Sequence, residues 1–172
     1  MNTQADIFVS PRSDRPMNKR CLYVLLLLFS STGLAWSAEV GEAIEQTIKA
    51  AAMAAATFSE TRDKQAVLAL YSKDYVGIQD GETETRDSVE KWLSDYESEL
   101  AKGSPLRFIG AVSNVNVRMT GLTAWATYEY VFQAVRHGEL EAQDRGQCTA
   151  LLRKESSAWL IFHEHCSRPR RP

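Results

Sequence analysis

Apolar residues in the first half of the chain recur at helical spacing. Between residues 44 and 58 they follow one another at intervals of three or four, which predicts one long amphipathic helix that begins near Glu39. The apolar stripe of this helix consists of Ile44, Ile48, Ala51, Ala55 and Phe58. Since only one face is apolar, we expect the helix to cover a sheet.

Two shorter helices and one strand follow in the sequence. Asp63 is an N-cap residue for a short helix over residues 64–71, and residues 74–78 read as a strand that ends at the Asp80–Gly81 turn. Thr85 then caps a third helix, which ends before Gly103. Its single apolar face consists of Val89, Trp92, Leu93, Tyr96 and Leu100.

From Leu106 onward the apolar period changes from about 3.6 residues to 2, which indicates strands. The longest alternating runs are 123–135, 145–154 and 158–167, and turn residues separate them. Helices followed by consecutive strands predict an α+β domain. In this domain, about three N-terminal helices pack on one face of a curved, cone-shaped antiparallel sheet that encloses a cavity.

The N-terminal segment has the order of a secretory signal peptide. Within residues 17–38, Lys19 and Arg20 precede a short apolar run, and small residues follow it. We expect cleavage after Ser37 or Ala38, and the alternative is an uncleaved N-terminal anchor. Residues 1–16 read as an upstream extension before the true start at Met17. Residues 39–172 then form a single domain.

Charge and hydropathy narrow the possible partners. The formal net charge is −2, and residues 1–38 contain more basic than acidic side chains, so the mature chain is more acidic still. This balance argues against a nucleic-acid partner. No later segment is apolar enough to span a bilayer, so we expect no membrane association after cleavage and a periplasmic or secreted location.

Two segments near the C-terminus carry a family resemblance. The runs Asp144–Thr149 and Trp159–Ser167 resemble the SnoaL-like branch of the nuclear-transport-factor-2-like superfamily, closest to the association domain of calcium/calmodulin-dependent protein kinase. The resemblance covers residues 44–169 and implies a pocketed domain that forms a dimer or a larger homo-oligomer. The kinase domains carry pocket arginines where this chain has Glu129, Ala150 and Cys166, so their anionic ligand is not implied.

Carboxylates on the last strands are the candidates for chemistry. Alternation places Glu164 on the apolar face of the final hairpin, where desolvation would raise its pKa and favour proton transfer. The same alternation along residues 127–130 places Glu129 on the inner face with Glu164. The alternative is a structural carboxylate that is hydrogen-bonded to its surroundings. The predicted ligand pocket consists of Tyr75, Trp92, Trp125, Glu129, Phe162 and Glu164.

Histidine and cysteine spacing gives two further expectations. His163 and His165 share a strand face but lack a third ligand, because His137 lies on a distant turn, so we predict no metal site. A three-residue loop at 156–158 would place Cys148 opposite Cys166 and allow a disulfide. A two-residue loop would instead place His165 opposite Cys148.

The sequence leaves three functions open. The favoured one is an exported, oligomerising module that holds a small apolar or aromatic ligand and needs no cofactor. The second is an isomerase, cyclase or dehydratase that uses Glu164 or Glu129 as a general base. The third is a partner-binding subunit that presents the outer sheet face with His163 and His165.

Overall fold

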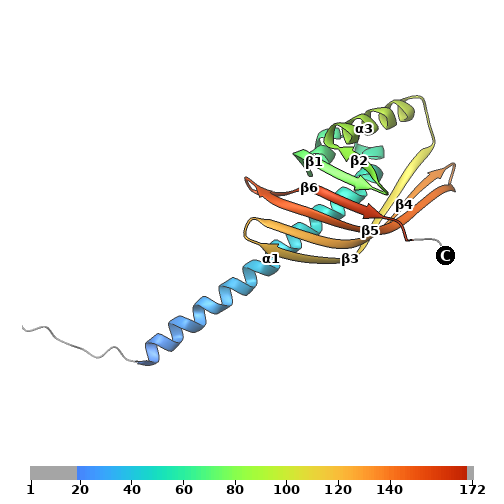
Figure 1. Cartoon of the computed structure of the whole chain (residues 1–172). Helices are drawn as coiled ribbons and strands as arrows, with labels where there is room; N and C mark the ends of the chain where they lie inside the picture. The colour runs from blue at the N-terminus through green and yellow to red at the C-terminus, as the bar shows by residue number, and fades with distance from the viewer. Residues whose placement is uncertain (1–18, 170–172) are drawn as a thin grey trace, which may run out of the picture. The chain divides into compact units, whose positions relative to one another are not determined.

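The computed structural model describes the backbone of residues 19–169 and the side chains of residues 38–169. The chain divides into two units, Met1–Ser37 and Ala38–Pro172, and every strand among the described residues belongs to the second (Figure 1). In chain order, the elements are α1 (Lys19–Thr61), α2 (Lys64–Leu68), β1 (Tyr71–Gln79), β2 (Glu82–Thr85), α3 (Arg86–Ala101), β3 (Leu106–Thr120), β4 (Thr123–Arg136), β5 (Glu139–Glu155) and β6 (Ala158–Ser167).

The N-terminal predictions fall largely outside this description. The expected upstream extension, residues 1–16, lies outside the described residues, and so do the side chains of the expected signal peptide up to Ser37. The first helix begins at Lys19 rather than near Glu39. Among the described residues, no helix combines the length and the hydropathy that a membrane span requires. Cleavage and export stay predictions.

The six strands between Tyr71 and Ser167 belong to one sheet, in the order β2-β1-β6-β5-β4-β3. The predicted α+β architecture with a curved sheet is confirmed, but the sheet is mixed. Neighbouring strands are antiparallel except β1 and β6, which run parallel, with Gly77 paired to Glu164. The parallel pair arises because β1 precedes α3 and the four-strand meander, so the chain must cross over before β6 lies beside it.

Local sequence signals define the two short helices well. Asp63 caps α2, where its side chain accepts from the Ala66 backbone N–H at 3.0 Å. Thr85 and Ser88 form a reciprocal capping box at the start of α3. Pattern analysis missed β2, whose residues Glu82–Thr85 are all polar and therefore give no apolar alternation.

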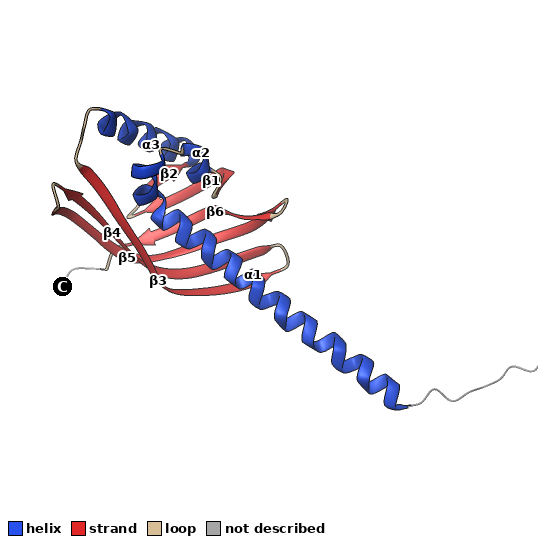
Figure 2. Ribbon diagram, turned by 180° about the vertical axis from the view of Figure 1, so that it is seen from behind, coloured by secondary structure: helices blue, strands red, loops and turns tan. Residues whose placement is uncertain are grey.

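The core lies between α1 and the inner face of the sheet. Its fully buried side chains come from helices and strands alike and include Ile44, Ile48, Phe58, Leu68, Leu93, Leu152 and Ile161. Figure 2 shows the C-terminal part of α1, which belongs to the same unit as the strands, crossing one face of the sheet. Helix and sheet approach closely at Gly110 in β3, where an added Cβ would collide with the backbone carbonyl oxygen of Ala52. Glycine at this position therefore sets the distance between helix and sheet.

Replacing Gly110 with alanine should destabilise the domain by about 1–3 kcal/mol, because the helix must shift to accept the new methyl group. Urea unfolding measures this loss. The same change at Gly41, where an added Cβ meets no atom within 4 Å, is the control and should cause no loss of stability. Equal stability of the two variants would contradict the close helix–sheet contact.

Candidate functional site

A β-bulge in β6 determines which side chains of the last strand face inward. Leu152 of β5 pairs with Ile161, but Leu151 pairs with His163, so Phe162 is an extra residue without a partner in β5. A bulge of this kind reverses the alternation beyond it. Ile161 is inward before the bulge, and Glu164 and Cys166 are inward after it.

The same bulge brings the two cysteines together. The hairpin closes through a two-residue loop, since Glu155 pairs with Ala158, and this register alone would place His165 opposite Cys148. The extra residue shifts the pairing by one, so that Cys148 lies opposite Cys166. The two sulfur atoms form a disulfide with an S–S distance of 2.06 Å. The expected disulfide is therefore present, but a two-residue loop and a bulge align the two cysteines instead of a three-residue loop.

Three tyrosines and two carboxylates meet on the inner face of the sheet. This tyrosine–carboxylate cluster consists of Tyr71, Tyr75, Glu84, Tyr128 and Glu164, from β1, β2, β4 and β6. The Tyr128 hydroxyl donates a hydrogen bond to Oε1 of Glu164. The Tyr75 hydroxyl donates to Oε2 of Glu84 at 3.2 Å. Tyr71 packs against Tyr75 with ring centroids 4.7 Å apart.

Gly77 makes room for this arrangement. An added Cβ there would collide with the Tyr75 hydroxyl, and it would lie 3.4 Å from Oε2 of Glu84. Gly77 is also the register partner of Glu164. The absence of a side chain therefore lets the Tyr75 ring lie across the strand and reach Glu84.

Burial dominates the electrostatics of the cluster. Desolvation raises the pKa of Glu164 from 4.5 to about 7; the Tyr128 hydrogen bond acts in the opposite direction, and the charge of Glu84 adds to the rise. Desolvation likewise raises the pKa of Glu84, against the effect of its bond to Tyr75. Burial and the nearby carboxylates raise the pKa of all three tyrosines, so they stay neutral at physiological pH.

A cavity of about 350 Å³ opens beside the cluster. Alanines of α1 form one wall and strand residues form another, with Glu84 and Glu164 among the lining side chains. The aromatic lining residues are Tyr71, Trp92, Phe108, Tyr128, Tyr130 and Phe132. A second, more polar cavity of about 410 Å³ shares Gln79 and Glu84 with it and is also lined by Ser88 of α3 and by Arg168. The first cavity has the aromatic, mostly apolar lining that is typical of small-molecule sites.

The structure brings together only part of the predicted pocket. Glu164 and Trp92 line the cavity. Tyr75 is buried and donates a hydrogen bond to Glu84, which also lines the cavity. Glu129 and Trp125 do not line it. Both lie on the outer face of β4, because Tyr128 is the residue opposite Cys148 and its neighbours alternate away from it.

The surroundings of Glu129 and Trp125 agree with a position on the outer face. Glu129 accepts a hydrogen bond from the side-chain amide of Asn114 at 2.8 Å, and the Trp125 side chain is 42% exposed. In β4 the small residues Ala124 and Ala126 face inward and the large ring of Trp125 faces outward. In β4 the size of a side chain therefore does not indicate which face of the sheet it occupies. The predicted inward placements of Glu129 and Trp125 are wrong.

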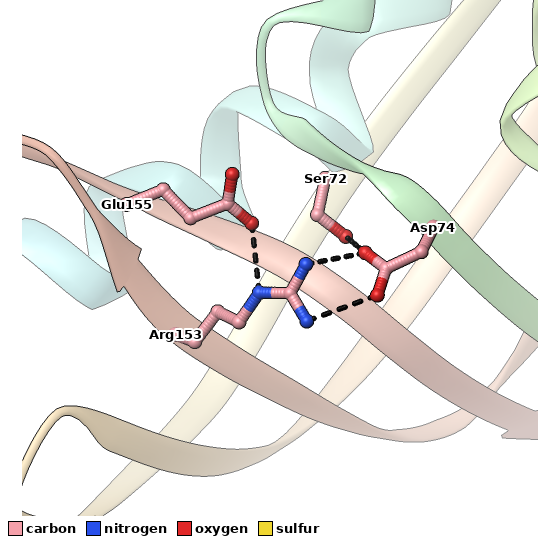
Figure 3. Close-up of polar contacts among 4 residues, drawn as sticks. All are labelled: Ser72, Asp74, Arg153 and Glu155. Atoms are coloured by element: carbon pink, nitrogen blue, oxygen red, sulfur yellow. Dashed lines mark hydrogen bonds and ion pairs between the residues drawn. The ribbon is translucent and has the colours of Figure 1, made fainter.

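Phe162 lies on the outer face because it is the bulged residue. Arg153 of β5 has its guanidinium carbon 5.2 Å from the centroid of the Phe162 ring. The same guanidinium binds Asp74 of β1, as Figure 3 shows. Arg153 also donates to Glu155 at 2.7 Å, and the Ser72 hydroxyl donates to Asp74 at 2.9 Å. Arg153 holds the pKa of Asp74 down at about 2. This group connects β5 to β1 across β6 at the position of the bulge.

The two histidines of β6 lie at register positions away from the cavity. His163 pairs with Leu151 and Val76, and His165 with Thr149 and Ile78. Within the part of the chain that the structure describes, no three His, Cys, Asp or Glu side chains gather in a way that could hold a metal ion.

Sequence reasoning missed three members of the cluster. Glu84 was hidden in the polar strand β2, and Tyr71 was assigned to a helix. Tyr128 had a usable signal, since the pairing of β4 with β5 places it opposite Cys148, which was already assigned to the inner face.

Comparisons with known proteins agree with this architecture. The SnoaL-like domain model matches residues 45–171. No curated protein matches the chain. A solved nuclear-transport-factor-2-like protein with a cystatin-like fold from Novosphingobium aromaticivorans is 16% identical, with a TM-score of 0.59, over 80% of this chain and 88% of that one.

Two further solved structures are similar. A protein provisionally named scytalone dehydratase, also from Novosphingobium aromaticivorans, is 14% identical with a TM-score of 0.60 and covers 82% of this chain and 89% of its own. A Xanthomonas campestris protein provisionally named a calcium/calmodulin-dependent protein kinase II association domain is 20% identical with a TM-score of 0.50, over 67% and 81%. At these identities the likeness shows the fold.

The pH dependence of stability reports the state of Glu164. Its pKa rises from 4.5 to about 7 on folding, so its ionisation opposes folding as the pH rises through 7. Glu164→Gln should therefore be more stable than the wild type at pH 8, by up to about 3 kcal/mol, and equally stable at pH 4.5. Urea unfolding at both pH values measures the difference.

Glu129→Gln is the matched control, since it makes the same change on the outer face, and it should show no such pH-dependent gain. A difference between Glu164→Gln and the wild type that is equal at both pH values would mean that ionisation of Glu164 is not the cause.

Proposed function

Because the chain belongs to the family of SnoaL-like domains, we propose that its interior cavity binds a small, largely apolar or aromatic molecule. The observation that carries this proposal is the cavity of about 350 Å³, walled by six aromatic side chains and the alanines of α1. Its volume suits a ligand of modest size, and most of its lining residues are apolar or aromatic. Aromatic walls favour a flat ligand through stacking and apolar contact.

The proposed module is exported and assembles with copies of itself. The signal-like order of residues 17–38 supports export, and the disulfide between Cys148 and Cys166 suits an oxidising compartment. The likeness to a provisionally named association domain supports assembly as a dimer or a larger homo-oligomer.

Native mass spectrometry of the protein purified from the periplasm tests this proposal. The expected result is an oxidised homo-oligomer that begins at residue 38 or 39 and carries a bound small molecule. Ala51→Phe, which places a ring in the cavity, should remove that molecule. Ala50→Phe makes the same change on the exposed side of α1 and should leave it bound. Equal retention by both variants would contradict the cavity as the binding site.

A second candidate function is proton-transfer catalysis, in an isomerase, cyclase or dehydratase. One observation favours it: Glu164 lies on the cavity wall with a pKa raised to about 7, next to the hydroxyl of Tyr128. A general base works best when its pKa is close to the working pH, and a neutral phenol can donate to a developing oxyanion.

Substrate screening separates the two functions. If the cavity is an active site, Glu164→Gln should lower kcat by about 100-fold or more and leave the melting temperature no lower than that of the wild type. Glu129→Gln should leave turnover unchanged. Turnover that survives in Glu164→Gln would exclude this carboxylate as the base.

A further inference from the structure

All the charged side chains that line the cavity are acidic. Three carboxylates line it, Glu84, Asp144 and Glu164, and the lining contains no Lys, Arg or His. Asp144 already has partners, because Arg168 lies 2.9 Å from its carboxylate and the Gln79 amide donates to it at 3.4 Å. Glu84 and Glu164 are the two acidic groups that remain.

These two carboxylates have phenol partners but no cationic partner. Glu164 accepts from Tyr128 and Glu84 accepts from Tyr75, and neither carboxylate lies within 4 Å of a basic group in the described residues. A buried carboxylate without a countercharge is unfavourable, and either a proton or a nearby cation relieves it. Within residues 38–169, no Lys, Arg or His lines the cavity and could supply this cation.

The rest of the wall suits a cation as well. Phe108 stacks on Phe132 with centroids 5.0 Å apart and contacts Trp92 at 5.5 Å. Aromatic faces attract organic cations through their quadrupoles, most strongly when water is excluded. The hydroxyl of Tyr130, also on this wall, is buried close to the carboxylate of Asp144 and makes no hydrogen bond in the described structure.

On the premise of the proposed binding function, we propose that the ligand is an organic ammonium ion with an apolar or aromatic body. Its positive centre lies between the carboxylates of Glu84 and Glu164, and its body lies against the rings of Trp92, Phe108 and Phe132. Anionic ligands are disfavoured, because the wall has three acidic groups and no basic one to receive them.

Three probes of similar shape and different charge test this inference: phenyltrimethylammonium, its uncharged analogue tert-butylbenzene, and benzenesulfonate. Amide NMR titration of the oxidised protein at pH 8.5 measures each affinity and locates the site. The expected result is that the cation binds at least tenfold more tightly than the neutral probe, with shifts around the cavity, and that benzenesulfonate does not bind.

The preference for the cation over the neutral probe should weaken as the pH falls. Phenyltrimethylammonium keeps its charge at every pH, so any change must come from the protein. At pH 5 Glu164 is mostly protonated, and the cation's advantage should fall below about threefold. The other groups near Glu164 do not oppose this change: Glu84 also has a raised pKa, the three tyrosines stay neutral, and Asp144 is paired to Arg168.

Variants identify the groups responsible. Glu164→Gln should lower the affinity for the cation at least fivefold at pH 8.5 and leave that for tert-butylbenzene unchanged, and Glu84→Gln should do the same to a smaller degree. Glu129→Gln, on the outer face, should change neither affinity.

Failure of the ammonium inference and failure of the binding function give different results in this experiment. If the neutral probe or benzenesulfonate binds in the cavity as tightly as the cation, the ammonium inference is overturned and the binding function stands. If none of the three probes shifts the cavity amides, both the inference and the binding function are overturned.

Discussion

The extra residue at Phe162 is the constraint on which the inner surface of this domain depends. With regular pairing from the two-residue loop, His165 would lie opposite Cys148 and Glu164 would face outward. The bulge reverses that alternation, so the carboxylate enters the cavity and the disulfide can form. A single inserted residue thus determines both the chemistry and the covalent link of the last strand.

Contacts on both faces of the sheet hold the bulge in place. On the outer face, Arg153 reaches across Phe162 from β5 to Asp74 in β1, and β1 has its own irregularity between Tyr71 and Val76. On the inner face, the disulfide pairs Cys166 with Cys148 just beyond it. Because exposed ion pairs contribute little to stability, we assign Arg153 a role in alignment. The covalent link prevents β6 from slipping along β5.

Inside the cavity, desolvation and hydrogen bonding compete, and desolvation is the larger effect. The phenol of Tyr128 stabilises the carboxylate of Glu164, yet the pKa of that carboxylate still rises to about 7. Glu164 has no basic partner among the described residues, whereas Arg153 binds the more exposed Asp74 on the outer face. The proposed preference of the cavity for a cation rests on this interior carboxylate.

The sequence by itself determined the family and most of the helices and strands, with β2 as the exception. Caps at Asp63 and Thr85, a helical stripe over residues 44–58 and the alternation after Leu106 act locally, so they can be identified along the chain. Tertiary structure alone decided the register of β6, the direction of Trp125 and Glu129, and the meeting of Glu84 with Tyr75. The reason is that strand alternation has a period of two, so one bulged residue reverses every position beyond it, and local sequence does not mark that residue.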